Sequence, residues 1–335
     1  MSIIYKILGK PGKDNALFVW INSGTRMYRL LFDCVEGLLN ELKPQDVNSV
    51  DYLFFSHLHL DHAAGFDYFF RRNYDRAAKP VFIFGPENTS LIIHHRLRGY
   101  TWNLVGNAPG VWNISDILNN EVTHFRFYTS EGFSKKHKLK TAPRKSIILE
   151  NGSFTVEAII LNHIIPSIGY LVTEKDYLNI DKDKLEKSGL PAGIWLQQVK
   201  DFSIDGKNKI TIDNKTYTLN ALRKMLLKKH RGESIAYLTD FIYKGNTLPA
   251  LRKFLNKCDT VVCESQYSQN DISLAEKNFH LTTGQAARIA KCAGVTNLVL
   301  FHISERYKFN EDYKGLLEEA KKIFPNTTYP PEWNA

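Results

Sequence analysis

The sequence predicts an α/β fold in which functional side chains gather at the ends of strands. Five apolar runs, rich in β-branched or aromatic residues, each precede a residue that can bind a metal or transfer a proton. Helical patterns alternate with these runs along the chain. Strand ends that converge on one rim present side chains from a rigid scaffold, so we expect residues distant in sequence to meet there.

The expected strands are short and bounded by polar residues. A first strand is expected at 1–8, and the five runs are 51–56, 154–162, 234–239, 259–263 and 297–301. Expected helices are 63–72, which has an aromatic face, and 86–98, 248–256, 282–292 and 311–324. Thr282 and Gln285 predict a capping box, and Gly294 suits the position that ends the same helix.

Residues 171–218 break this alternation. Charged and turn-forming residues dominate there, around Gly189–Gly193, with a hairpin-like turn at 205–208. We interpret the segment as an arm or lid inserted into one domain that spans 1–335, and not as a second folding unit. A chain of 335 residues with 43% hydrophobic residues is expected to be globular throughout.

Composition excludes few functions. Lys and Arg number 44 against 35 Asp and Glu, and the net charge of +9 is compatible with a polyanionic partner without being specific for one. The N-terminus lacks signal-peptide features and no apolar run is long enough for a membrane span, which favours a cytoplasmic protein without membrane contact. Cys34, Cys258, Cys263 and Cys292 have no CxxC spacing, suit a reducing compartment and are expected in the core.

The stretch His57–His62 is the strongest local signal, because it holds four potential metal ligands in six residues after an apolar run. Imidazole and carboxylate are ligands that zinc selects. His57 and His59 alternate along an extended segment, point the same way and can share one metal. Asp61 and His62 lie where the chain turns into a helix and can serve a second metal nearby. The pattern specifies a metal site better than it specifies a reaction.

Four further candidates directly follow the other apolar runs: His163, Asp240, Glu264 and His302. Taken alone, His163 or His302 could equally be a metal ligand or a core histidine with satisfied hydrogen bonds, and Asp240 is somewhat better explained as a cap at a strand end. The placement of all three at strand ends favours metal ligands.

Together these motifs resemble the metallo-β-lactamase superfamily, and within it the short-form ribonuclease Z (tRNA 3′ endonuclease) family. The similar stretches are 31–37, His57–His62, 163–170, 237–240, Cys263–Glu264, 279–282 and 300–307. The resemblance implies a four-layer αβ/βα sandwich, a homodimer and two zinc ions per chain, with Mn²⁺ or Fe as alternatives. It assigns the ligands by motif position: His57, His59 and His163 on one ion, Asp61, His62 and His302 on the other, and Asp240 bridging.

Two cations at such a rim suit phosphodiester hydrolysis, since they activate water and neutralise the charge that builds in the transition state. Asp61 is the candidate general base. His280, oriented by Glu264, is the candidate proton donor to the departing oxygen, and Asp33 would orient a histidine ligand. The plainer interpretation makes Glu264 a carboxylate facing water and His280 a loop histidine.

The sequence departs from the family pattern where the substrate would be selected. The loop at 8–15 lacks an Arg-Asn pair, the arm reads Leu190-Pro-Ala-Gly193 without a Gly-Pro pair, and Cys263-Glu264-Ser265 replaces a His-Glu-Ala-Thr-like sequence. The aromatic stretch 100–112 has no family counterpart, and core packing is favoured over a place in the cleft. Basic runs at 135–145 and 223–231 are each more often solvated than bound to phosphate.

The leading hypothesis is a zinc-dependent phosphodiesterase that processes the 3′ ends of tRNA precursors. A second hypothesis keeps the fold and the metals but takes a small phosphodiester, a cyclic nucleotide or a sulfate ester. A mobile basic arm would favour tRNA, whereas a lid folded over the cleft would favour the small molecule. A third, a non-catalytic RNA-binding module, is disfavoured because all seven candidate ligands are present.

Overall fold

The computed structural model describes residues 2–24, 26–309 and 311–334. Within them the chain forms two compact units, which we describe separately. The larger unit comprises residues 2–174 and 233–334, and the smaller unit comprises residues 175–232. No helix among the described residues is long and apolar enough to cross a membrane.

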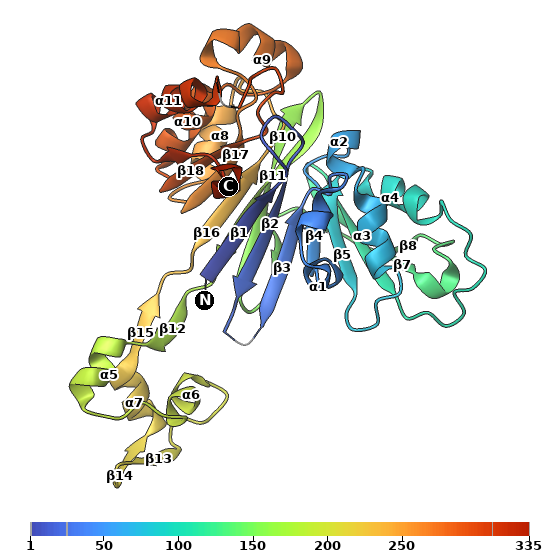
Figure 1. Cartoon of the computed structure of the whole chain (residues 1–335). Coiled ribbons are helices and arrows are strands. Elements are labelled where there is room, and N and C mark those ends of the chain that lie inside the picture. Colours follow the sequence, from blue (N-terminus) through green and yellow to red (C-terminus); the bar gives the residue numbers. More distant parts are fainter. Residues whose placement is uncertain (1, 25, 310, 335) are drawn as a thin grey trace. The chain divides into compact units, whose positions relative to one another are not determined.

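The larger unit contains two large sheets (Figure 1). The first sheet holds eight strands in chain order: β1 Ser2–Leu8, β2 Ala16–Asn22, β3 Met27–Phe32, β4 Tyr52–Phe54, β5 Val81–Pro86, β6 Val111–Ile117, β7 Glu121–Tyr128 and β8 His137–Pro143. Strands β3 to β6 are parallel, and antiparallel strands flank them on both sides. The ends of β3 and β4 therefore lie at one edge of this sheet.

The second sheet has the order β19-β18-β17-β16-β11-β10-β9. Its strands are β9 Ile147–Glu150, β10 Phe154–His163, β11 Ile165–Glu174, β16 Ser234–Leu238, β17 Thr260–Glu264, β18 Asn297–Phe301 and β19 Thr327–Thr328. Strands β16 to β19 are parallel, and β10 runs in their direction because both β10 and β16 are antiparallel to β11. The ends of β10, β16, β17 and β18 consequently share one edge, as the sequence predicted.

Three apolar clusters organise these sheets into layers. The first cluster lies between the sheets, where the ring of Phe32 is 5.7 Å from that of Tyr170 and 5.6 Å from that of Tyr237. The second covers the outer face of the first sheet, and the third covers the outer face of the second sheet. The covering helices are α1 Pro44–Asn48, α3 Phe66–Asn73 and α4 Thr89–Leu97 on one side, and α8 Thr247–Phe254, α10 Thr283–Ala293 and α11 Tyr313–Ile323 on the other (Figure 1). This confirms the four-layer αβ/βα sandwich.

Helix α10 begins and ends as predicted. Thr282 Oγ1 accepts a hydrogen bond from the backbone N–H of Gln285 at 3.2 Å, and Gln285 Oε1 accepts one from the N–H of Thr282 at 2.9 Å. Gly294 ends the helix with φ +64°. The cysteine prediction holds for three residues and is wrong for Cys292, which is exposed because other positions of α10 form its packed face.

The smaller unit differs from the predicted arm in its boundaries and in having an apolar core. Residues 171–174 belong to β11 in the main sheet, and the unit continues past 218 to Gly232. It contains the helices and strands β12 Tyr177–Ile180, α5 Lys182–Ser188, α6 Trp195–Lys200, β13 Lys209–Ile212, β14 Lys215–Thr218, α7 Leu219–Leu226 and β15 Leu227–His230. Val199, Leu222 and Leu226 are among the buried residues of its core. The segment therefore has a small apolar core of its own, and its role as an arm or lid inserted into one domain stays a prediction.

The hairpin of this unit is not at 205–208. Its strands are β13 and β14, and the two-residue turn is Asp213-Asn214, with φ +47° and +62°. A turn with two positive φ angles matches the twist of paired strands, and Asn and Asp tolerate that conformation. At 205–208 a backbone hydrogen bond closes a turn, from Asn208 N–H to Asp205 O at 3.0 Å, outside the hairpin.

Candidate metal centre

The loop that carries His57–His62 is fixed to the turn after β3 by backbone contacts. The N–H of Cys34 donates to the carbonyl of His62 at 2.8 Å, and the N–H of Gly65 donates to the carbonyl of Cys34 at 2.8 Å. A Cβ atom at Gly65 would lie 2.2 Å from Val35 O, so only glycine fits this close approach. The predicted helix 63–72 corresponds to α3, Phe66–Asn73, and the separate short helix α2, Leu60–Ala63, precedes it, with Gly65 between the two.

Three residues of the site have unusual backbone conformations at strand ends. Asp33 has φ +60°, Asp240 +51° and His302 +52°. Such values are uncommon outside glycine, and they persist where the surrounding structure enforces them, often at functional sites. Asp33 follows β3, Asp240 follows β16, and His302 follows β18.

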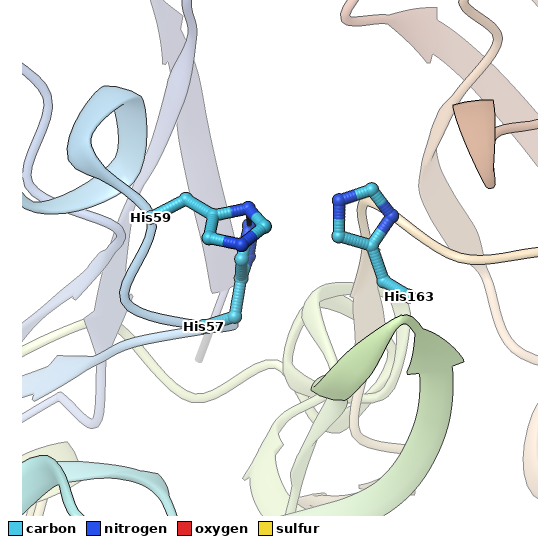
Figure 2. Close-up of side chains that lie close together, drawn as sticks. All are labelled: His57, His59 and His163. Carbon is cyan, nitrogen blue, oxygen red and sulfur yellow. Dashed lines mark hydrogen bonds between the residues drawn. The ribbon is translucent and has the colours of Figure 1, made fainter.

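One group of potential ligands consists of His57, His59 and His163. Their ligand atoms all lie within 4.8 Å of one another, and Figure 2 shows the ring of His163, at the end of β10, opposite the rings of His57 and His59, which lie in the loop after β4. His57 Nε2 lies 3.0 Å from His59 Nδ1. Two nitrogens bound tetrahedrally to one zinc ion lie about 3.3 Å apart, so this spacing suits a shared cation. The carbonyl of Phe279, 2.9 Å from His163 Nδ1, anchors the third ring.

A second group consists of Asp61, His62, Asp240 and His302, whose ligand atoms also lie within 4.8 Å of one another. Among the described residues, His302 Nε2 is buried and has no hydrogen-bond partner. Leaving a buried polar nitrogen unsatisfied costs roughly 1–3 kcal/mol, a cost that a bound cation removes. The donor set and this unsatisfied nitrogen both fit a divalent metal ion.

Asp240 faces both groups. Its Oδ2 lies 3.9 Å from His57 Nε2, 3.5 Å from His62 Nε2 and 3.7 Å from His163 Nε2, and its Oδ1 lies 3.6 Å from His302 Nε2. Burial favours the neutral acid, but the charges of His302 and His62 outweigh it and hold the pKa of Asp240 well below its usual value. One ionised carboxylate thus stands between the two sets of ligands.

Asp33 holds one of the candidate ligands in place through a network of buried hydrogen bonds. It is fully buried and accepts hydrogen bonds from Ser56 N–H at 2.7 Å, from Ser56 Oγ at 2.8 Å and from the Tyr237 hydroxyl at 2.9 Å. Its Oδ2 also lies 2.8 Å from His62 Nδ1, which leaves His62 Nε2 directed at Asp240. A carboxylate behind a ligating histidine fixes the orientation and tautomer of the ring.

The second predicted pair, His280 and Glu264, is in direct contact. His280 Nδ1 lies 2.9 Å from Glu264 Oε2. Glu264 is fully buried and does not face water, and its other oxygen accepts from the N–H of Phe241 at 2.7 Å. Burial alone would lower the pKa of His280, but the Glu264 carboxylate outweighs it and raises that pKa to about 9. The His280 ring lies 4.9 Å from the ring of His163 and 5.7 Å from that of His302. A protonated imidazole therefore borders both groups of ligands.

Asp61 lies at the same rim and carries a charge opposite to that of His280. Its side chain is 42% exposed, and its Oδ2 lies 3.4 Å from His62 Nε2. Burial raises the pKa of Asp61, but the hydrogen bond and charge of His62 outweigh this effect and lower the pKa to about 2. The carboxylate is ionised at neutral pH and accessible to a reactant.

Two supporting residues were not predicted from the sequence. The Gln266 side-chain amide lies 3.3 Å from His302 Nδ1, and Asn15 Oδ1 accepts a hydrogen bond from the backbone N–H of His302 at 3.3 Å. Both lie in or beside stretches that depart from the family pattern. The one signal in the sequence for either residue is that it is polar and stands next to a motif. Beside His302 opens a cavity of about 430 Å³, lined in part by Lys13, Asp14 and Gln266.

The chain is similar to known proteins along nearly its whole length. A family model described as "Anti-Pycsar protein Apyc1" matches residues 13–177. The chain is 37% identical to a ribonuclease Z of Deinococcus radiodurans over 327 residues, covering 98% of this chain and 97% of that protein. It is 27% identical to a ribonuclease Z of Chlamydia abortus, covering 95% and 89%.

Two solved structures share the fold at low sequence identity. The metallo-β-lactamase fold protein YhfI from Bacillus subtilis superimposes with a TM-score of 0.58 at 15% identity, over 98% of this chain and 96% of that one. The short form of human tRNase Z superimposes with a TM-score of 0.52 at 18% identity, over 91% and 94%. The protein is thus a metal-dependent hydrolase of the metallo-β-lactamase fold, and the 37% identity along nearly its whole length shows that it belongs to the ribonuclease Z family.

Proposed function

We propose that this protein is a cytoplasmic, homodimeric endoribonuclease that cuts tRNA precursors at the 3′ side of the tRNA. The observation that carries the proposal is the position of Asp240, whose carboxylate stands between two groups of metal ligands while the His280–Glu264 pair borders both. This arrangement suits a phosphodiester, because it combines two cation sites with a proton donor.

The seven rim residues divide into two sites. His57, His59 and His163 would hold one zinc ion, Asp61, His62 and His302 the other, and Asp240 would bind both. When bound, such a pair supplies a hydrolytic nucleophile at neutral pH and neutralises charge on the reacting phosphate. The same His and Asp donors also accept Mn²⁺ or iron, so the metal in the cell depends on availability as well as affinity.

Asp61 and His280 handle protons in opposite directions. Asp61 is ionised at neutral pH and partly exposed, so it can accept a proton from the attacking water. His280 carries a proton at neutral pH, because its pKa is about 9. Glu264 holds Nδ1 of that ring and leaves Nε2 for the departing oxygen. A positioned general acid of this kind contributes roughly 10²- to 10⁴-fold to the rate.

Charge distribution supports an RNA substrate. The smaller unit, residues 175–232, contains 13 Lys and Arg against 7 Asp and Glu, so it carries six of the nine net positive charges of the chain. Its segment 189–193 lies where short-form family members carry a tRNA-gripping arm. Basic side chains outside the metal centre would bind the tRNA backbone by neutralising phosphates.

A small phosphodiester, such as a cyclic nucleotide, is the second candidate, with a sulfate ester in the same class. One observation favours it: the cavity of about 430 Å³ beside His302 is within the size range of small-molecule sites. The altered loop at 8–15 contributes Gly12, Lys13 and Asp14 to its lining. Asp14 and Glu305 make the same cavity partly acidic, which weighs against an anionic ligand.

Cleavage mapping separates the two candidates. Zinc-loaded protein is incubated with a tRNA precursor bearing a 3′ trailer, in parallel with the Asp240→Ala variant and with a chromogenic phosphodiester. A single cut just past the acceptor stem, absent in the variant, supports the endoribonuclease. Turnover of the small phosphodiester without any cut in the precursor would reject it in favour of the small-molecule hydrolase.

A further inference from the structure

One sequence feature outside the metal centre, the aromatic stretch after α4, lines a cavity of about 410 Å³. Arg98, Tyr100, Trp102 and Val105 come from this part of the chain, and Ser130, Glu131, Gly132 and Ser134 complete the lining. The volume is that of a ligand site, since such pockets span roughly 300–1,000 Å³.

The aromatic wall of this cavity is held in place. Trp102 Nε1 donates to the carbonyl of Leu97 at 2.9 Å, so the indole has no polar atom left to satisfy. A Cβ atom at Gly132 would lie 2.7 Å from the Cβ of Trp102, so the indole packs directly on the glycine. The ring of Tyr100 lies 6.2 Å from that of Trp102 and 5.8 Å from that of Phe70, yet Tyr100 is 48% exposed. The wall thus includes one aromatic ring, that of Tyr100, which packs on its neighbours and is about half exposed to solvent.

The cavity lining carries one cation without an ion pair. Within the described part of the chain, Arg98 is exposed and forms no ion pair. Glu131 is the carboxylate in the lining, and it is engaged by His137 Nε2 at 2.7 Å. An unpaired guanidinium beside an exposed aromatic ring suits a ligand that has both a flat ring and a negative charge.

The cavity lies within reach of the metal centre. Asp67 accepts a hydrogen bond from Arg96 Nε at 3.0 Å, which ties α4 to α3, and the Asp67 carboxylate also interacts with the hydroxyl of Tyr100 in the cavity lining. Asp67 follows His62 by five residues, so their Cα atoms are no more than about 18 Å apart. A few nucleotides of extended RNA span the distance from His62 to Asp67 and on to Tyr100.

We propose that this cavity binds an unpaired nucleotide of RNA, with the base stacked on Tyr100, whose ring stands at 72° to that of Trp102, and a phosphate at Arg98. Resting on the proposed function, we assign this nucleotide to the 3′ trailer, because the acceptor stem is base-paired whereas the trailer beyond the cut is not. Stacking on aromatic rings tolerates any base, which suits trailers of varied sequence. The pocket would hold a part of the trailer that lies beyond the metal centre.

Binding of a short single strand tests the pocket without cleavage of a precursor. Fluorescence anisotropy of labelled octauridylate is measured with the zinc-loaded protein and with the variants Arg98→Ala, Tyr100→Ala and Tyr100→Phe. Arg98→Ala and Tyr100→Ala are expected to weaken binding about fivefold or more, the lower end of what one lost stacking contact costs, whereas Tyr100→Phe keeps near wild-type binding. Arg71→Ala and Tyr68→Ala are matched controls, because both residues are exposed on α3 and lie outside the cavity lining.

Equal binding by all variants would overturn the pocket, and so would equal losses in the variants and their matched controls. Thermal melting of each variant excludes a folding defect as the cause of a loss. On precursors, Arg98→Ala is expected to raise KM for a ten-nucleotide trailer and not for a one-nucleotide trailer, with kcat unchanged. If the wild-type protein cuts no precursor while the octauridylate losses persist, the proposed function fails and RNA binding at the pocket stands. If precursors are cut and octauridylate binding is unaffected, the pocket fails alone.

Discussion

Replacing Glu264 by glutamine should remove the proton from His280 while leaving the metal ligands in place. The buried carboxylate lies 2.9 Å from His280 Nδ1 and accepts the N–H of Phe241 at 2.7 Å. Glutamine is nearly the same size and its carbonyl oxygen can keep the bond to Phe241. Its NH₂ group would then face His280 Nδ1, where it favours the neutral imidazole over the imidazolium.

The magnitude follows from the pKa of His280, which is about 9 in the native site. Without the Glu264 charge, burial is the largest remaining effect and favours the neutral ring against the charge of Asp240, so the pKa should fall toward the ordinary value of about 6.5. The difference corresponds to roughly 3 kcal/mol of stabilisation of the protonated ring. At pH 7.5 the protonated fraction should fall from nearly complete to about one tenth or less, and kcat should fall about tenfold or more with it.

The assay is the pH dependence of kcat for precursor cleavage, with zinc content measured on the same samples. In the wild-type protein the rate should fall as pH rises through about 9, because the general acid is lost there. In Glu264→Gln this alkaline limb should move to lower pH, and activity should recover partly toward pH 6. His280→Ala should lose the limb and slow turnover at all pH values while keeping its zinc. Zinc loss in His280→Ala, or an unmoved limb in Glu264→Gln, would refute the assignment of His280 as the proton donor.

Three further outcomes are expected. Asp240→Ala should lose both metal ions and activity together, because its carboxylate lies within 3.9 Å of histidines from both groups of ligands; elemental analysis that finds near two ions per chain would contradict its bridging role. Zinc uptake should release a proton, because the Asp240 and Asp33 carboxylates outweigh burial and raise the pKa of His62, which must lose its proton to bind zinc. The affinity for zinc should therefore weaken as pH falls. Titration calorimetry in buffers of different ionisation enthalpy counts the protons released, and a count of zero would contradict this prediction. Gly65→Ala should destabilise the protein by several kcal/mol and lower its zinc content, because a Cβ atom there would lie 2.2 Å from Val35 O. The control Gly315→Ala, in open space on α11, should be neutral or stabilising by up to about 1 kcal/mol. Equal melting temperatures for the two variants would contradict the close approach at Gly65.

The sequence predicted the strand-end clustering because its signals are local. His57 to His62 lie within one turn of the chain, and each remaining ligand directly follows an apolar run. Parallel strands then bring these ends to one edge, as β16, β17 and β18 do for Asp240, Glu264 and His302. The four layers came from the family resemblance and not from the patterns themselves, and the order of strands in the sheets was not predicted.

What the sequence did not predict depends on contacts between distant segments. Gly65 interrupts a helical pattern because it meets Val35, thirty positions earlier. Asn15 and Gln266 support His302 through hydrogen bonds that no spacing rule indicates. The core of the smaller unit is built from helices of six to eight residues, which are too short to show a clear amphipathic period.

The most direct test of the dinuclear centre is a crystal structure of the zinc-loaded protein with anomalous scattering measured at the zinc edge. Two peaks about 3.5–4 Å apart are expected, one among His57, His59 and His163, the other among Asp61, His62 and His302, with the Asp240 carboxylate between them. A single peak, or peaks that Asp240 does not contact, would contradict the two-metal centre on which the proposed cleavage of RNA depends.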